Sequence, residues 1–176
     1  YENIILSVGR LSEQKGFDMA ISAASKLKKK GIKFKWFIIG SGPLKDKLND
    51  QIEKENVKDY VELLGTKSNP YPYIKNCDIF VQPSRYEGKS VVIDEAKILA
   101  KPIVATAYPT VKDQIQNGNE GIIVELNIDG IVNGIVALCS DNVKKQQIVA
   151  YLEKQEYGNQ NEVKKYINLI EGEMKI

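Results

Sequence analysis

The stretch IILSVGRLSEQKGFDMAISAASKLKKKGIKFKWFII, residues 4–39, decides the fold. It opens with a short apolar run at residues 4–8 and closes with a second one at residues 35–39. Between them, residues 17–29 place apolar side chains at spacings of three and four, which is the spacing of one face of a helix. A strand, an amphipathic helix and a second strand predict a βαβ unit with parallel strands.

The same alternation continues toward the C-terminus. Apolar runs that predict strands follow at residues 61–64, 79–82, 103–105 and 121–124. Helical patterns lie at residues 44–55, 72–76, 90–99, 111–117 and 128–139, and a polar helical tail begins at about residue 142. We therefore expect an α/β fold in one domain over residues 1–176: a Rossmann-like, open, mostly parallel six-stranded sheet flanked by helices.

Composition limits the class of protein. Of the 176 residues, 43% are hydrophobic and 27% are charged, a balance typical of a soluble globular domain. Lys plus Arg number 25 against 23 for Asp plus Glu, which disfavours a nucleic-acid-binding surface. Histidine is absent, so Ser-His, Cys-His and His-ligated zinc chemistry are excluded within this chain. We expect Cys77 and Cys139 to be free buried thiols, and the chain, which begins without Met, to be part of something longer.

Ligands of open parallel sheets bind beyond the carboxyl ends of the strands, so the loops there carry the candidate site. The loop after the first predicted strand, residues 9–16, contains Arg10 and Lys15. Two cations just before a helix suit a diphosphate; the alternative is that they are ordinary exposed charges. The spacing of Gly9 and Gly16 departs from G-x-G-x-x-G, which disfavours a nicotinamide-binding domain. Residues 40–43, Gly-Ser-Gly-Pro, predict a tight turn between a strand and a helix.

The strongest candidate site follows the fourth predicted strand, in residues 83–96, PSRYEGKSVVIDEA. A helix that begins near Ser90 points the unpaired amides of residues 88–91 into the cleft, where they can receive a phosphate. Glu87 lies before that helix and Glu95 along it, so the two carboxylates flank the phosphate position and can accept hydrogen bonds from sugar hydroxyls. The alternative is that Glu87 is an acid favoured by the helix dipole and Glu95 a solvated helix residue.

In these motifs the chain resembles the C-terminal domain of family-4 retaining glycosyltransferases, which is one half of the GT-B fold. The family signature is two glutamates separated by seven residues, here Glu87 and Glu95. The surrounding stretches fall in family order as well: VGRL at 8–11, KG at 15–16, IGSGPL at 39–44, PS at 83–84 and PIVA at 102–105. The resemblance runs from about residue 3 to residue 125.

The resemblance implies a role for each candidate residue. Glu87 contacts the transferred sugar and is the catalytic residue, while Glu95 binds the ribose. Arg10 and Lys15 bind the donor diphosphate. The remaining substrate-binding positions are the amides of Gly88, Lys89, Ser90 and Val91, at the phosphate and sugar, and Gly65, Thr66 and Lys67, beside the base. No cofactor and no metal is needed, because cationic side chains and a helix dipole stabilise the departing nucleoside diphosphate.

Three positions depart from the family pattern. Lys89 stands where an apolar or aromatic residue is common, which bears on the sugar contacts. Ala100 replaces the glycine that usually ends the glutamate-bearing helix. Tyr108 and Pro109 replace a glycine pair after the fifth strand, so the shape of that loop cannot be carried over from the family.

Together these inferences predict the donor-binding domain of a retaining hexosyltransferase that uses a nucleoside diphosphate sugar, as in polysaccharide biosynthesis. The acceptor, a glycan, a lipid or another molecule, would bind an N-terminal domain absent from this chain, so the fragment alone is expected to be inactive. We expect a cytoplasmic location and no nucleic acid partner; peripheral association with the inner membrane surface through that other domain stays open. Two alternatives remain: half of a GT-B nucleotide-sugar epimerase, and a noncatalytic nucleotide-binding or interaction module.

Overall fold

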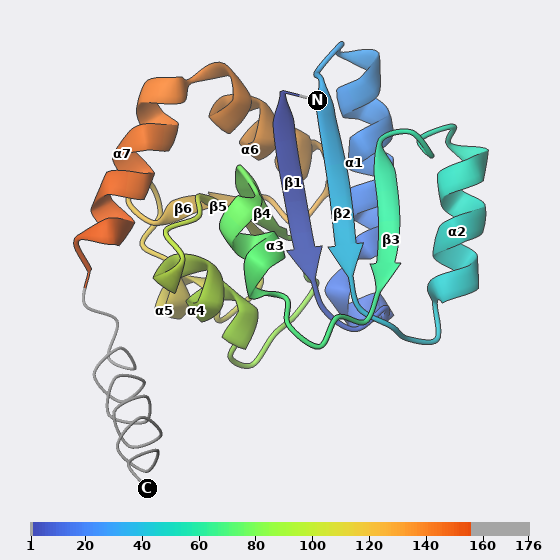
Figure 1. Ribbon diagram of the computed structural model, residues 1–176, viewed down its shortest axis with the longest axis horizontal. Coiled ribbons are helices and arrows are strands. Elements are labelled where there is room, and N and C mark those ends of the chain that lie inside the picture. The colour runs from blue at the N-terminus through green and yellow to red at the C-terminus, as the bar shows by residue number, and fades with distance from the viewer. Residues whose placement is uncertain (1, 156–176) are drawn as a thin grey trace, which may run out of the picture.

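Six strands form one sheet in the computed structural model, which describes residues 2–155 (Figure 1). In chain order they are β1 Asn3–Val8, β2 Phe34–Ile39, β3 Val61–Gly65, β4 Ile79–Gln82, β5 Ile103–Thr106 and β6 Gly121–Val124. They lie side by side in the order β3-β2-β1-β4-β5-β6, and each neighbouring pair is parallel. The predicted Rossmann-like α/β fold is confirmed, and across the described strands the sheet is parallel throughout.

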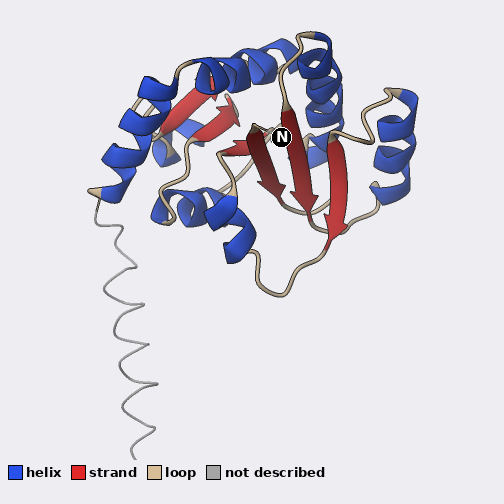
Figure 2. Cartoon of the chain, turned by 45° about the horizontal axis from the view of Figure 1, so that its top comes forward, coloured by secondary structure: helices blue, strands red, loops and turns tan. Residues whose placement is uncertain are grey.

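Helices connect the strands and cover both faces of the sheet (Figures 1 and 2). They are α1 Phe17–Lys29, α2 Lys45–Lys54, α3 Tyr71–Asn76, α4 Val91–Ile98, α5 Val111–Gln114, α6 Ile128–Ser140 and α7 Asn142–Glu153. A 3-10 helix, η1, spans Glu13–Lys15. The predicted bounds agree to within one residue except for α5, which ends at Gln114 because Ile115 is extended. The predicted tail begins with α7, and its part after residue 155 lies outside the described residues.

The two faces of the sheet carry separate apolar cores. Helices α1, α2 and α6 pack on one face, where Ile5 and Trp36 are fully buried. Helices α3, α4 and α5 pack on the other, where Leu6 and Phe80 are buried. Ile5 and Leu6 point to opposite faces because side chains alternate along a strand. Because all six strands are parallel, their carboxyl ends lie at one edge of the sheet, which positions the site.

At that edge, glycines let the loops after β1 and β2 pack backbone against backbone. Gly40 has φ 147, and a Cβ added there would lie 1.8 Å from the Gly9 carbonyl oxygen. A Cβ added at Gly42 would lie 2.4 Å from the Leu11 carbonyl oxygen. The Gly-Ser-Gly-Pro turn is therefore needed for loop packing, which agrees with its interpretation as a tight strand-to-helix turn.

The end of α4 keeps the cap geometry that a glycine usually supplies. Ala100 adopts φ 53, and the Lys101 amide donates to the Ala96 carbonyl at 2.9 Å. A left-handed conformation at a residue with a Cβ costs about 1–2 kcal/mol. The substitution of glycine by Ala100 therefore strains the cap without removing it.

Both cysteines are free thiols, as predicted. Burial raises the pKa of Cys77 to about 12 and that of Cys139 to about 11, although Cys139 is only partly buried. Both thiols therefore stay protonated near neutral pH. Among residues 2–155, no helix combines the length and apolar character that a membrane crossing demands.

Candidate functional site

The candidate site forms where the loop after β1 meets the loop after β4. These strands are neighbours in the sheet, so their loops lie side by side although more than 70 residues separate them in sequence. The Lys15 ammonium contacts Glu87 Oε1 at 2.6 Å, and the two side chains are 16% and 6% exposed. Two of the predicted site residues are thus brought into a mostly buried ion pair.

Three further side chains complete the hydrogen bonding of the Glu87 carboxylate. Gln82, the last residue of β4, donates to Oε1 at 2.9 Å, and the Ser84 hydroxyl donates to the same oxygen at 2.6 Å. Gln14 of η1 donates to Oε2 at 3.3 Å. The carboxylate is therefore held in one orientation by groups from both loops, with its charge compensated by Lys15.

Gly16 permits the close contact between the two loops. It has φ 65, and an added Cβ would lie 2.0 Å from the Pro83 carbonyl oxygen. Any other residue at this position would push η1 away from the β4–α4 loop. The conformation of Gly16 therefore sets how closely Lys15 approaches Glu87.

Arg10, the second predicted cation, differs from Lys15. Its side chain is exposed, and it has no ion-pair or hydrogen-bond partner within residues 2–155. It lines a cavity of about 450 Å³ with residues from the ends of β1 and β2 and from the loops that follow β1, β2 and β3. The guanidinium is thus available to an anion in that cavity.

The same cavity contains part of the predicted base-binding segment. It is lined by Val8, Gly9, Arg10, Ile39, Gly40, Ser41, Gly42, Thr66, Lys67 and Pro70. Gly65 ends β3 with φ 69, and its carbonyl accepts from the Gly40 amide at 3.0 Å. The Lys67 ammonium lies 5.7 Å from the ring centre of Tyr73, a cation–π arrangement. Arg10, Thr66 and Lys67 therefore border one hollow.

The start of α4 differs from the prediction. Ser90 is the N-cap and Val91 the first helical residue. The Ser90 amide, predicted to be open to a phosphate, donates to Gln114 Oε1 at 3.0 Å, and Gln114 Nε2 donates back to the Ser90 carbonyl at 3.2 Å. Within the described part of the chain, the amides of Gly88, Lys89 and Val91 have no protein acceptor. Three of the four predicted amides are thus open.

Glu95 lies on the second turn of α4 in a looser environment than Glu87. Its carboxylate accepts one hydrogen bond, from the Tyr71 hydroxyl at 3.2 Å, and Tyr71 is itself 50% exposed. Burial raises the pKa of Glu95, and the Tyr71 hydrogen bond opposes that shift. The charge of Glu95 in turn raises the pKa of Tyr71. A ligand hydroxyl can therefore hydrogen-bond to the Glu95 carboxylate if it displaces the hydroxyl of the exposed Tyr71.

Two buried hydroxyls border the Glu87 loop. Among the described residues, the Ser90 Oγ and the Tyr108 hydroxyl are buried without a hydrogen-bond partner. Burial raises the pKa of Tyr108, and the nearby charges of Glu87 and Asp94 raise it further. Tyr108 is 1% exposed, so this departure from the glycine pair fills the core beneath the loop. Lys89, the other departure, is exposed and pairs with Asp94 at 3.5 Å.

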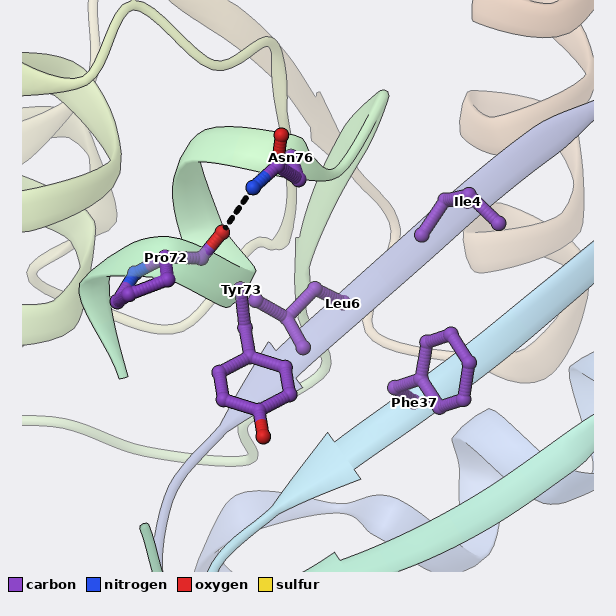
Figure 3. A pocket seen from close by; sticks show the side chains of 6 residues that line it. All are labelled: Ile4, Leu6, Phe37, Pro72, Tyr73 and Asn76. Atoms are coloured by element: carbon purple, nitrogen blue, oxygen red, sulfur yellow. Dashed lines mark hydrogen bonds between the residues drawn. The ribbon is translucent and has the colours of Figure 1, made fainter. Parts of the chain in front are cut away.

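A separate apolar hollow lies along β1 and β2 beside α3 (Figure 3). Its volume is about 330 Å³, and its walls are Ile4, Leu6, Phe37, Pro72, Tyr73 and Asn76. The Asn76 side chain donates to the Pro72 carbonyl at 2.7 Å, which uses one of its two amide N–H donors. None of the described residues that form these walls is charged, although the Lys67 ammonium lies over the Tyr73 ring.

Several residues of the site were missed by the sequence analysis. Gln82 and Ser84 had a detectable sequence feature, because polar residues end a fully buried strand just before Glu87. Gln14 lies in the predicted cationic loop but carries no charge to mark it. Gln114 and Tyr71 reach the site from other helices, and no local pattern around them indicates this. Among residues 2–155, no group of three or more metal-binding side chains is assembled.

Comparison with known proteins gives consistent matches. The family model described as glycosyl transferases group 1 matches residues 1–155. The N-acetylgalactosamine-N,N'-diacetylbacillosaminyl-diphospho-undecaprenol 4-alpha-N-acetylgalactosaminyltransferase of Campylobacter jejuni is 33% identical over 143 residues, which cover 80% of this chain and 38% of that protein. This chain thus spans well under half the length of that relative.

Solved structures show the same fold. A TarM mutant from S. aureus, crystallised with fondaparinux, alpha-GlcNAc-glycerol and UDP, superposes with a TM-score of 0.83 at 27% identity, over 95% of this chain and 35% of TarM. The C-terminal domain of the glycosyl transferase group 1 family protein LpcC from Francisella tularensis superposes with a TM-score of 0.74 at 24% identity. That match covers 85% of this chain and 82% of the other.

Proposed function

Since the chain belongs to the glycosyl transferases group 1 family, we propose that it is the donor-binding, C-terminal domain of a family-4 retaining glycosyltransferase. Its substrate would be a nucleoside diphosphate sugar of the hexose type. The acceptor, a glycan, a lipid or another molecule, would bind a second, N-terminal domain. The fold match to the LpcC C-terminal domain, which covers 82% of that domain, supports assigning this chain to the C-terminal domain.

The observation that carries the proposal is the convergence of two cations, a fixed carboxylate and open amides at one sheet edge. Lys15 and Glu87 are in contact, and Arg10 lines the adjoining cavity. The open amides of Gly88 and Val91 lie just beyond Glu87. Binding of a nucleotide alone would explain the cations and amides, whereas transfer also explains a carboxylate fixed beside them.

We assign the leaving-group role to Arg10, Lys15 and the open amides at the start of α4. A lysine ammonium has three N–H donors, so Lys15 can keep Glu87 as one partner and donate to a phosphate oxygen as well. Cations and helix-terminal amides that are already oriented stabilise the departing diphosphate in the transition state. We propose that this set neutralises the charge without a metal or cofactor.

The other assignments follow from position. Glu87, fixed by four donors, would accept from the hydroxyls of the transferred sugar and hold it for reaction. Glu95 would accept from the ribose after displacing Tyr71, and the segment of Gly65, Thr66 and Lys67 would border the base. UDP in the TarM crystal supports a nucleoside diphosphate as the ligand of this edge. We further propose a cytoplasmic location, with membrane association through the second domain.

Calorimetric titration of the chain with UDP, GDP and ADP, each with magnesium and with a chelator, tests the proposal. We expect weak, metal-independent binding of one of the three, because half of an interdomain cleft is provided by the second domain. Binding that required magnesium would overturn the assignment of charge neutralisation to Arg10, Lys15 and the α4 amides. Failure of all three diphosphates to bind would overturn the donor-binding function itself.

A further inference from the structure

Two charged side chains that do not line the Arg10 cavity join the same two loops. Arg85 lies in the loop after β4 and Asp18 in the first turn of α1. The guanidinium Nη1 lies 2.8 Å from Asp18 Oδ1, and Nη2 lies 2.6 Å from Oδ2. Paired parallel hydrogen bonds of this kind fix orientation as well as distance. We call this pair the Arg85–Asp18 strap.

The strap also binds the backbone of η1. Arg85 Nη1 donates to the Glu13 carbonyl at 2.7 Å, and the Arg85 amide donates to the Gln14 carbonyl at 2.8 Å. Gly16, directly after η1, contacts the Pro83 backbone too closely to tolerate a Cβ. The β4–α4 loop is therefore docked on η1 through side-chain and main-chain contacts together.

The residues at the ends of the strap are close in sequence to the proposed ligand-binding residues. Arg85 precedes Glu87 by two residues, and Asp18 follows Lys15 by three. Yet Arg85 and Asp18 line a different hollow, of about 310 Å³, with residues of α2 and its N-terminal end. They do not line the cavity that contains Arg10. The strap is thus placed to hold the Lys15 and Glu87 backbones without touching a ligand in that cavity.

We infer that Arg85 and Asp18 are positioning residues for the proposed donor site. By locking the β4–α4 loop against η1, they set the distance between the Lys15 ammonium and the Glu87 carboxylate. The inference rests on the proposed function for what these two groups bind. A lysine on a flexible four-carbon stem fixes no geometry by itself, so the placement must come from its backbone. Small misplacements of groups that bind a reacting ligand have large effects.

The alternative, that the strap simply adds stability, is disfavoured by its exposure. The Arg85 and Asp18 side chains are 35% and 37% exposed, and ion pairs at this exposure contribute little to global stability. Burial pushes the pKa of Asp18 upward, but the hydrogen bonds and charge of Arg85 outweigh it and leave that pKa lowered. Asp18 is therefore ionised near neutral pH, and the strap is formed there.

Asp18→Asn in the whole 176-residue chain tests the inference, with Asp129→Asn as the matched control. Asp129 also pairs with a cation of α1, Lys26, at 2.7 Å, but on α6 and outside the site. The first readout needs no nucleotide: hydrogen exchange of the segments 10–18 and 83–90, followed by mass spectrometry. The second is calorimetric affinity for UDP and for uridine. Asp18→Glu serves as the conservative rescue.

We expect Asp18→Asn to speed exchange in both segments and to weaken UDP binding on the order of tenfold, the loss expected when one charge-assisted hydrogen bond is misplaced. Uridine affinity and the Asp129→Asn variant should stay at the parental values, and Asp18→Glu should recover most of the UDP affinity. If hydrogen exchange were unchanged in Asp18→Asn, the inference would be overturned regardless of the UDP affinity. Faster exchange with an unchanged UDP affinity would also overturn it. A parent chain that binds UDP, GDP and ADP equally poorly would instead defeat the proposed function.

Discussion

Glu87 and Glu95 belong to one sequence motif, yet the protein surrounds them in opposite ways. The Glu87 side chain is 6% exposed and accepts from four side chains, one of them the Lys15 ammonium. Glu95 has a single donor, the Tyr71 hydroxyl, on a tyrosine that is half exposed. The Glu87 carboxylate is therefore held by hydrogen bonds within the protein before any ligand arrives, whereas the Glu95 carboxylate is held by only one.

The difference shows which part of the edge is preorganised. Around Glu87 the loops after β1 and β4 are locked together through Gly16 and the Arg85–Asp18 strap. Around Glu95 the contact crosses from α4 to the short helix α3 by one exposed hydrogen bond. Disturbing the first region should therefore alter stability and geometry, whereas disturbing the second should mainly alter what binds there.

The largest effect is expected from removing the cation at Glu87. Lys15→Met keeps the apolar stem but leaves the Glu87 carboxylate mostly buried without its counter-charge. Breaking a buried pair in this way costs up to about 3–5 kcal/mol, and because three hydrogen bonds remain we expect about 2–3 kcal/mol. Urea unfolding of the ligand-free chain measures it. Arg10→Met is the control and should stay within about 0.5 kcal/mol of the parent, since Arg10 is exposed. Equal losses in the two variants would refute the comparison of the two cations.

A smaller effect separates the two carboxylates by ligand. Glu95→Gln should weaken UDP and UDP-glucose alike, by about 1 kcal/mol, because a neutral amide accepts less strongly from the ribose. Glu87→Gln should weaken UDP-glucose by roughly 1.5–3 kcal/mol and spare UDP. Lys15, freed from its partner, remains available to the diphosphate in that variant. Calorimetry with both ligands measures the four affinities.

Parental affinities for both ligands in both variants would mean that Glu87 is a structural acid and Glu95 a solvated one. Loss of UDP binding in Glu87→Gln alone would show instead that the carboxylate acts by placing Lys15. The two results contradict different parts of the proposal. Parental affinities would remove the sugar and ribose roles of the two glutamates. Loss of UDP binding in Glu87→Gln alone would keep the site but change the role of Glu87.

The fold could be predicted because its determinants are local. Apolar runs and spacings of three and four mark each strand and helix, and parallel order then brings the loops after β1 and β4 together. The meeting of Lys15 and Glu87 follows from that topology. The error at α5, where Ile115 is extended, arose because the apolar pattern continues past the residue at which the backbone leaves the helix.

The contacts that tune the site could not be predicted. Gln114 accepts a hydrogen bond from the Ser90 amide, although 24 residues separate them in the sequence. Arg85 pairs with Asp18, which is 67 residues away in the sequence. These are single polar pairs between non-periodic positions, so no pattern in either segment indicates its partner. Arg85 lies within the motif of residues 83–96, but nothing in the sequence distinguishes it from an ordinary exposed charge. Only the folded structure shows that it pairs with Asp18 and binds the backbone of η1.

The smallest effect is a pair of opposite pH dependences. The folded pKa of Asp18 is lowered despite burial, chiefly by Arg85, so its contribution is present above the unfolded pKa and is lost as pH falls through the folded value. The folded pKa of Glu95 is raised by burial, so its contribution is present below the unfolded pKa and is lost as pH rises through the folded value. Both residues are only partly buried, which limits each effect to less than about 1 kcal/mol. Urea unfolding between about pH 2.5 and 7, a range that extends below the ordinary carboxyl values, should show Asp18→Asn losing stability relative to the parent as pH rises. Glu95→Gln should gain stability relative to the parent over the same rise. If the stability difference from the parent changed with pH in the same direction in both variants, Glu95 would be as fully paired as Asp18. The contrast between the preorganised region around Glu87 and the looser region around Glu95 would then be lost.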